Sequence, residues 1–300
     1  MNCSAFFEQN GIEFYKDFNM KNITTFKIGG KAKYLVYPDN IDKLVSIVEF
    51  ADESNTKYVV LGNCSNILVS DYGFDGIVII TSKINKFFIE NDYVYAECGV
   101  LLSQLSRKVC ELGLTGLEFG MGIPGTIGGA VYMNAGAYGY EIKDILTHVE
   151  VLDNREIKKL SNEELNFSYR HSILQDNNLI LLKAYFKLKF SEDPNLPLKL
   201  AGQMNFKRKE KQPLNLPNAG SIFKRPSGYY AGKLIEDANL KGFRIGDAMV
   251  SEKHAGFIVN CGSATSTDVL KLIKHIQKVV FENYGVILEP EIKLIGNFNN

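Results

Sequence analysis

The spacing of apolar residues predicts helices and strands that alternate through the first two thirds of the chain. Residues 41–48 carry apolar side chains at helical spacing. Residues 101–112 do so again, directly before Gly113, a residue type common just after a helix. Short apolar runs between and beyond these segments are typical of strands. We expect strands at residues 58–61, 77–80, 93–96 and 149–152.

A strongly alternating segment precedes the last third of the chain. Residues 182–190 have the period of a half-buried strand, and the side expected to face the core carries Leu182, Ala184, Phe186, Leu188 and Phe190. The polar, proline-containing residues 191–197 are the best candidate for a linker. Beyond them we expect a strand at 257–259. A helix should run from about Asp268 to Tyr284, with Thr265 and Asp268 as a capping box and Gly285 as its end. These elements describe an α+β protein.

Composition and charge narrow the functional classes. Because 34 basic residues balance 34 acidic ones, no overall field favours nucleic acid or an anionic membrane. The five cysteines are scattered, odd in number and without a CxxC pair, which argues against a disulfide framework and a zinc site and suits a reducing cytoplasm. No apolar run approaches the roughly 20 residues of a membrane helix. We expect a cytoplasmic protein without a signal peptide and without a metal centre.

Glycines concentrate in one segment of the chain. Nine of the 26 glycines fall between Gly113 and Gly139, a density that we expect to exclude a regular helix or strand. Residues 120–125 match the spacing GxGxxG, but Gly128 and Gly129 disfavour the helix that a Rossmann dinucleotide site requires. A backbone nest for a pyrophosphate fits better, and residues 62–66 offer a second such turn. The alternative for both is a tight structural turn.

Nine blocks of sequence resemble the family of UDP-N-acetylenolpyruvoylglucosamine reductases, also called UDP-N-acetylmuramate dehydrogenases. The resemblance runs in order from about residue 24 to residue 296. Only 40 residues separate Arg170 from Lys211, which is similar to the shorter subtype that lacks an extra tyrosine-bearing loop. The blocks are IGG (28–30), GNCSN (62–66), GIPGTIGGA (122–130), MNAGAYG (133–139), SYRHS (168–172), AGSIFKRP (219–226), AGKLI (231–235), KHAGFIVN (253–260) and LEPEIKLIG (288–296).

The resemblance implies both a domain plan and a reaction. Residues 1–195 would form an FAD-binding region of the vanillyl-alcohol-oxidase type, with lobes of about 1–70 and 71–195, and residues 196–300 a smaller α+β substrate-binding domain. The implied reaction is NADPH-dependent, FAD-mediated reduction of UDP-N-acetylglucosamine enolpyruvate to UDP-N-acetylmuramate, a step of peptidoglycan precursor synthesis. FAD would be bound non-covalently, and NADPH would supply the hydride. The expected partner is this small UDP-sugar, bound by a monomer.

Carried over position by position, the resemblance implies that the backbone of two stretches approaches FAD closely. We expect Gly128 and Gly129 to adopt positive φ angles there, which side chains with a branched Cβ disfavour. The expected cofactor-binding residues are Gly62, Asn63, Cys64, Ser65, Asn66, Gly122, Ile123, Pro124, Gly125, Thr126, Gly128, Gly129, Asn134, Ala135 and Gly136.

Three residues match the catalytic positions of the family. Arg170 matches its catalytic arginine, Ser221 its proton-donating serine and Glu291 its catalytic glutamate. A guanidinium can hold a carboxylate through two parallel hydrogen bonds, and a hydroxyl beside the reacting carbon can donate a proton. From the residues alone, the alternatives are a surface arginine, a turn serine and an exposed Glu–Lys face of a strand.

Substrate binding is expected from Lys211, Lys253 and His254, with Lys211 meeting the substrate diphosphate. The alternative for the basic run at 207–211 is a solvated charged face. A competing function is that of another FAD-dependent oxidoreductase of the same fold, acting on an alcohol or sugar, which would lack the blocks at 219–226 and 288–296. A non-catalytic nucleotide-binding protein and an RNA-binding module fit less well. The first need not keep the three catalytic residues, and the second needs a basic, aromatic signature.

Overall fold

The computed structural model describes residues 2–298, which form two compact units, each assembled from separate stretches of the chain. The first unit comprises residues 2–16, 34–63 and 76–208, and the second comprises residues 17–33, 64–75 and 209–298. Both units combine helices with sheets, which confirms the α+β class. Within residues 2–298, no helix has the length and apolar character that crossing a membrane requires. The expected division into an FAD-binding region at residues 1–195 and a substrate-binding domain at residues 196–300 depends on which ligand each part binds, and it stays a prediction.

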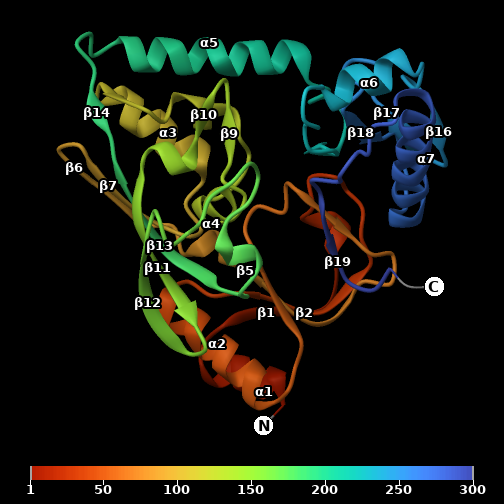
Figure 1. The fold of residues 1–300 in the computed structure, drawn as a ribbon. Coiled ribbons are helices and arrows are strands. Elements are labelled where there is room, and N and C mark those ends of the chain that lie inside the picture. Colours follow the sequence, from red (N-terminus) through yellow and green to blue (C-terminus); the bar gives the residue numbers. More distant parts are fainter. Residues whose placement is uncertain (1, 299–300) are drawn as a thin grey trace. The chain divides into compact units, whose positions relative to one another are not determined.

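The first unit contains the whole of a five-stranded sheet and the larger part of a four-stranded sheet. The five-stranded sheet is antiparallel, with the β6–β7 hairpin at one edge (Figure 1). Its strands, in order, are β12 (Glu156–Ser161), β11 (Leu146–Asp153), β13 (Ile180–Lys187), β7 (Tyr93–Glu97) and β6 (Phe87–Glu90). In the four-stranded sheet β3 and β5 are parallel. Its strands, in order, are β1 (Glu13–Asn19), β2 (Lys31–Tyr37), β5 (Phe74–Ile80) and β3 (Tyr58–Leu61).

Short helices and two-residue ladders complete the first unit, and one continuous cluster of buried apolar residues joins them to the sheets. The helices are α1 (Cys3–Gln9), α2 (Ile41–Glu53), α3 (Leu102–Glu111), α4 (Ile127–Tyr132) and most of α5 (Leu196–Lys211), with the 3₁₀ turns η2 (Thr81–Lys83), η3 (Glu118–Gly122), η4 (Ile142–Asp144) and η5 (Ile173–Gln175). The ladders pair β8 (Leu114–Thr115) with β14 (Lys189–Phe190), and β9 (Gly136–Ala137) with β10 (Tyr140–Glu141).

The second unit is an antiparallel sheet with two helices beside it. Its strands, in order, are β15 (Asn218–Ser221), β18 (Phe257–Asn260), β17 (Ala248–Val250) and β16 (Arg244–Ile245). The helices are α6 (Ala231–Asp237) and α7 (Ser266–Tyr284), and Figure 1 shows α7 alongside β16 and β17. A parallel pair joins β4 (Ile67–Val69) to β19 (Lys293–Ile295), and η1 (Met20–Asn22) lies in an early segment. Phe26, Ile28 and Leu68 therefore share a core with residues beyond 218.

Most of the elements expected from the apolar pattern are confirmed. The helix at α7 has the capping box of Thr265 and Asp268 and ends at Gly285, whose φ is +66°. The alternating strand is β13, but it ends at Lys187, and the expectation that Phe190 faces the core is wrong because its side chain is 63% exposed. Helix α5 went unpredicted: it has a weak apolar stripe, with only Pro197 and Ala201 buried. It takes in the end of the expected linker.

Candidate functional site

The two glycine-containing turns expected to hold FAD contact each other through residues 62–63 and 124–126 of the first unit. The side-chain amide of Asn63 donates a 2.6 Å hydrogen bond to the carbonyl of Pro124. A Cβ at Gly62 would overlap Oγ1 of Thr126, so the close approach of the two turns requires glycine at that position. Gly125 lies open, because the atom nearest to a Cβ at this position would be Cγ2 of Ile123, 3.9 Å away. The pair of turns therefore offers an exposed backbone surface of the kind that a phosphate group contacts.

The expectation that the glycine segment excludes a helix is wrong. Helix α4 begins directly after Thr126, whose Oγ1 accepts a 3.3 Å hydrogen bond from the N–H of Gly129. The N–H groups of Ile127 and Gly128 donate, each at 2.8 Å, to the carbonyls of Val100 and Cys98. These tertiary bonds and the cap offset the weak helix propensity of glycine. They also engage the N–H groups of Gly128 and Gly129 inside the protein.

The expectation of positive φ angles at Gly128 and Gly129 is wrong as well, because both residues are helical. A Cβ at Gly128 would lie 3.1 Å from the carbonyl oxygen of Cys98. Glycine is needed there because the helix packs closely on the end of a strand, as the third glycine of a nucleotide-binding turn does. A Cβ at Gly129 meets only ordinary contacts.

Arg208 lies beside the glycine segment, and the sequence did not single it out. A Cβ at Gly122 would lie 3.0 Å from Cδ of Arg208, so this arginine packs on the turn, and burial lowers its pKa. Its neighbours Lys207 and Lys209 are exposed. The basic run is thus divided between one half-buried guanidinium and solvated lysines.

Cys64 occupies a strained position in the turn at 62–66. Its φ is +50°, and its side chain is 5% exposed. Burial raises the pKa of the Cys64 thiol to about 12, so the thiolate that a covalent attachment needs is scarce at neutral pH.

Arg170 lies in a tight hairpin at residues 168–171, between β12 and η5 in the chain. Ser168 and His171 exchange two backbone hydrogen bonds, and Arg170 between them has a φ of +57°, a left-handed conformation unusual for arginine. Its guanidinium donates to the carbonyls of Gly136, at 2.9 Å, and Asn134, at 3.4 Å. The structure thus brings Arg170 together with the 134–136 stretch.

Asn134 connects several of these parts. It is fully buried, and its side-chain amide donates to the carboxylate of Glu141 at 3.1 Å and to the carbonyl of Ser168 at 3.0 Å. Its side-chain oxygen accepts from the N–H of Lys143 at 3.1 Å. The side chain of Asn134 therefore links the hairpin of Arg170 to the 134–136 stretch. Ala135 and Gly136 are half-exposed.

Ser221 lies at the end of β15 in the second unit and is exposed. The pairing register of β15 with β18 shifts between Asn218 and Ser221. Gly220, which lies between them, has a φ of +80°, and no atom lies within 4 Å of the place where a Cβ would be. A bulge of this kind redirects the following side chain, and bulges are common beside active sites. The alternative of a plain turn is wrong, since Ser221 belongs to a strand.

Glu291 is held beside this strand by backbone bonds. Its N–H donates to the carbonyl of Ile222 at 2.7 Å, and its own carbonyl accepts from the side chain of Asn66 at 3.5 Å. The N–H of Lys293 in turn donates to the carbonyl of Asn66 at 3.0 Å. Asn66, Ser221 and Glu291, predicted from separate blocks, therefore come together in the second unit.

The expected substrate-binding residues lie near the end of α5 and beside β18. Lys211 is exposed at the last position of α5, and the ammonium of Lys253 donates to the carbonyl of Lys209 at 2.9 Å. His254 precedes β18, which pairs with Ser221, and its Nδ1 accepts from the N–H of Gly256 at 3.1 Å. Burial lowers the pKa of His254, which favours the neutral ring.

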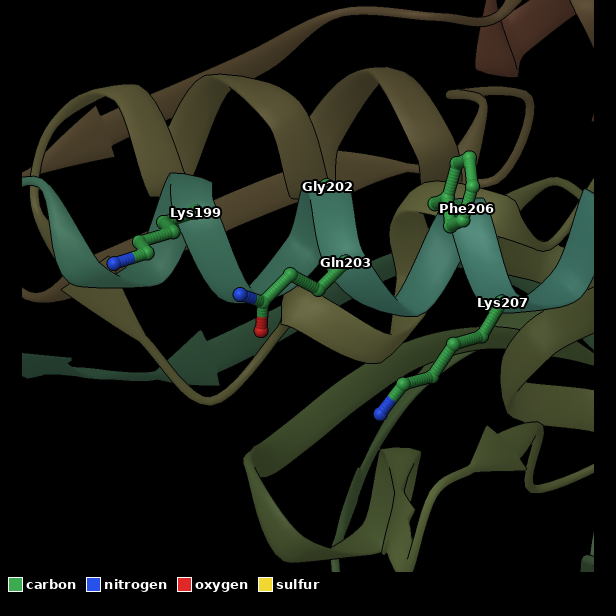
Figure 2. Close-up of a pocket in the computed structure, with 5 residues that line it drawn as sticks. All are labelled: Lys199, Gly202, Gln203, Phe206 and Lys207. Atoms are coloured by element: carbon green, nitrogen blue, oxygen red, sulfur yellow. The ribbon is translucent and has the colours of Figure 1, made fainter.

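A groove on α5 contains none of the expected site residues. Figure 2 shows it lined by Lys199, Gly202, Gln203, Phe206 and Lys207, all from this one helix. All five residues are exposed.

Comparisons with known proteins give two matching family models and several similar relatives. The family model described as "UDP-N-acetylenolpyruvoylglucosamine reductase, C-terminal domain" matches residues 212–295, and the one described as "FAD binding domain" matches residues 32–157. The UDP-N-acetylenolpyruvoylglucosamine reductase of Caldicellulosiruptor saccharolyticus is 57% identical over 97% of this chain and 94% of its own length. That of Clostridium novyi is 46% identical over 92% of this chain and 90% of its own length.

Two solved structures have folds similar to that of this chain. The UDP-N-acetylenolpyruvylglucosamine reductase of Thermus caldophilus superposes with a TM-score of 0.81 at 34% identity, covering 95% of this chain and 98% of its own. The BBE-like 1 protein of Physcomitrella patens gives a TM-score of 0.51 at 15% identity over 63% of this chain and 45% of its own, a likeness of fold alone. The expected FAD-binding fold, shared with vanillyl-alcohol-type oxidases, is confirmed.

Proposed function

The chain belongs to the family of UDP-N-acetylenolpyruvoylglucosamine reductases, and we propose that Arg170, Ser221 and Glu291 carry the reaction of this family. It is an FAD-containing oxidoreductase that uses NADPH to reduce UDP-N-acetylglucosamine enolpyruvate to UDP-N-acetylmuramate for peptidoglycan precursor synthesis. The observation that carries this function is identity of 57% across both units. The competing oxidase function lacks support, because the family match includes the C-terminal residues 212–295.

The residues present fit FAD. The turns at 62–66 and 122–126 would hold its phosphates, since Gly62 and Thr126 pack too closely for a side chain and Gly125 lies open. Gly128 and Gly129 contribute by placing α4, because their N–H groups bond inside the protein. The chemistry that bound FAD supplies is transfer of a hydride from NADPH to the alkene of the substrate. Every other step falls to side chains of this chain.

Arg170 would hold the substrate carboxylate. Hydride addition to the enolpyruvyl double bond builds negative charge toward that carboxylate, and a guanidinium stabilises it through two parallel hydrogen bonds. The carbonyls of Asn134 and Gly136 orient the guanidinium plane before the substrate arrives. Pre-orientation of this kind contributes directly to the rate.

Ser221 would donate the proton that completes the reduction. The hydroxyl proton passes to the alkene carbon next to the carboxylate, and water later reprotonates the serine. Gly220 leaves room for the substrate to approach this hydroxyl. Glu291, tied to Ile222 by its backbone, would orient the substrate at the same strand end.

The remaining assignments concern binding. We propose that residues 196–300 bind the UDP-sugar, with the exposed ammonium of Lys211 on its diphosphate and Lys253 and His254 beside it. Residues 1–195 would hold FAD in lobes of about 1–70 and 71–195. The substrate is a small molecule. We further propose a monomer that works in the cytoplasm, a compartment that suits five cysteines that form no disulfide within residues 2–298.

Two measurements test the function together. Purified protein should show the visible absorption of a flavin, and NADPH should bleach it. UDP-N-acetylglucosamine enolpyruvate should then restore the colour without oxygen, with UDP-N-acetylmuramate as the product. If the enolpyruvyl substrate does not reoxidise the reduced flavin, and an alcohol or sugar instead reduces the oxidised flavin, the competing oxidoreductase function is supported.

A further inference from the structure

The hairpin that carries Arg170 is fastened to the end of α4 by a residue that none of the sequence blocks includes. The side-chain amide of Gln175, at the end of η5, donates to the carbonyl of Arg170 at 3.1 Å and to the carbonyl of Tyr132 at 2.7 Å. We propose that Gln175 is a positioning residue, which fixes the backbone from which the Arg170 guanidinium extends. This inference rests on the proposed role of Arg170.

The backbone at Arg170 adopts an uncommon conformation, and a hydrogen bond to its carbonyl would help to hold it. Its φ of +57° places it in a left-handed conformation, which glycine and asparagine adopt readily and arginine does not. The hairpin around it is closed by two backbone bonds between Ser168 and His171. A donor on the carbonyl of Arg170 opposes rotation of the peptide that follows it. Residues held in unfavourable conformations persist where their surroundings determine them.

Both ends of Arg170 are bound to the same short stretch. The side chain of Gln175 links the backbone of Arg170 to that of Tyr132. The guanidinium of Arg170 donates hydrogen bonds to the carbonyls of Asn134 and Gly136. The amide of Asn134 adds a 3.0 Å bond to the carbonyl of Ser168. The guanidinium therefore has a fixed origin and a fixed direction relative to residues 132–136.

Gln175 is the better residue to test, because it is partly exposed, whereas Asn134 is fully buried with three hydrogen bonds of its side chain inside the protein. Substitution of Asn134 would disturb the fold itself. Gln175→Met keeps the length of the side chain and removes the amide. Gln175→Glu keeps the shape but replaces the donor by a carboxylate, which repels both carbonyls.

The loss expected is specific to the second half of the reaction. A displacement of about 1 Å of a catalytic group can slow a reaction by roughly 10²-fold. We therefore expect Gln175→Met to slow flavin reoxidation by the enolpyruvyl substrate about 10- to 100-fold, and Gln175→Glu at least as much. Reduction of the flavin by NADPH, flavin content and melting temperature should stay near wild type. The matched control is Asp176→Ala, which removes the 3.1 Å contact between the Asp176 carboxylate and Nε2 of His171 on the same loop without touching Arg170.

A double-mutant cycle decides whether Gln175 acts through Arg170. Gln175→Met is compared in the wild type and in Arg170→Ala, by reoxidation rate and by calorimetric affinity for UDP-N-acetylmuramate. We expect its effects on both to vanish in Arg170→Ala. Three outcomes overturn the inference while the role of Arg170 stands. Gln175→Met has the same effect in the wild type and in Arg170→Ala, or it reoxidises at the wild-type rate, or it slows flavin reduction as much as flavin reoxidation. If Arg170→Ala itself reoxidises at the wild-type rate, the proposed function of Arg170 is overturned first.

Discussion

The backbone N–H of Glu291 donates a 2.7 Å hydrogen bond to the carbonyl of Ile222, the residue that follows Ser221. A bridge between Phe223 and Pro290 extends this pairing. The two proposed catalytic side chains of the second unit are thus placed by backbone contacts, which do not depend on either side chain. Each can therefore be replaced without displacing the other.

Ser221→Ala should separate the two half-reactions. Reduction of the flavin by NADPH needs no proton from serine and should remain near wild type in stopped-flow bleaching. Reoxidation by UDP-N-acetylglucosamine enolpyruvate should slow by about 10²–10⁴-fold, the usual contribution of general acid catalysis. The exposed Ser227 offers a control, since Ser227→Ala should change neither half. Near-normal reoxidation in Ser221→Ala would falsify its role as donor, and failure of both halves would indicate a damaged flavin site.

Lys211→Ala should raise the KM for the UDP-sugar about tenfold with little change in kcat, because an ammonium that binds the diphosphate equally in ground and transition states affects binding alone. Steady-state kinetics with varied UDP-sugar measure both constants. Lys278→Ala on α7, where the lysine is 71% exposed, should change neither. A fall in kcat at constant KM contradicts diphosphate binding by Lys211.

Gly62→Ala should weaken FAD binding at least tenfold, because the added methyl overlaps Oγ1 of Thr126 and forces the two turns apart. Equilibrium dialysis of the protein against FAD gives the affinity. Gly202→Ala is the matched control: no atom lies within 4 Å of its new methyl, and it sits in the exposed middle of α5. That change should leave FAD binding intact and stabilise the protein by about 0.5–1 kcal/mol. Unchanged affinity in Gly62→Ala contradicts the proposed cradle.

Acid precipitation should release all of the flavin. Burial raises the pKa of Cys64 in the proposed cradle to about 12, so its thiol is protonated and a poor nucleophile at neutral pH. We therefore expect the yellow colour in the supernatant of trichloroacetic acid and none in the pellet. Flavin that remains with the pellet of the wild type, and leaves it in Cys64→Ser, would show a covalent bond at this residue.

Asp71→Ala should destabilise the protein by about 0.5–2 kcal/mol at pH 7, as loss of a helix cap does. The Asp71 carboxylate accepts from the N–H groups of Ser266 and Thr267, at 2.7 and 3.0 Å, two donors in the first turn of α7 that no carbonyl of the helix itself can reach. Burial pushes the pKa of Asp71 upward, but these hydrogen bonds outweigh it and hold the pKa below its usual value.

The sign of the pH dependence follows from that lowered pKa. The stabilisation by Asp71 is fully present above the unfolded-state pKa of about 3.9 and is lost as the pH falls through the folded-state value. Urea unfolding of the wild type and Asp71→Ala at pH 7, 4 and 3 should therefore show a difference that shrinks with acid. A difference that is constant across this range argues that the carboxylate charge contributes nothing.

Secondary structure with a strong local signal was predictable from sequence. Helix α7 shows why, since Thr265, Asp268 and Gly285 mark both of its ends. Helix α5 was not predictable, because its apolar residues form no clear stripe. Helix α4 was wrongly predicted to be absent. The hydrogen bonds that offset the weak helix propensity of its glycines are accepted by the carbonyls of Val100 and Cys98, which no local pattern connects to the helix.

The candidate site was predictable only through its resemblance to a family. Arg170, Ser221 and Glu291 have no local signature that separates them from surface residues, whereas the blocks around them do. The positions of Gln175 and Arg208 could not be predicted, because each is defined by carbonyls or glycines distant in sequence. The strained φ of Arg170 likewise becomes visible only in three dimensions.

The interleaving of the two units has a consequence for synthesis on the ribosome. Phe26, Ile28 and Leu68 emerge early, yet their packing partners in the second unit are made only after residue 218. The parallel partner of β4 is β19, the last strand of the described chain. We therefore expect these early apolar segments to lack their packing partners until translation is nearly complete, and the nascent chain to be prone to aggregation without chaperones. The 212–295 segment made alone would lack part of its own core, so gene fragments should be designed around the whole chain.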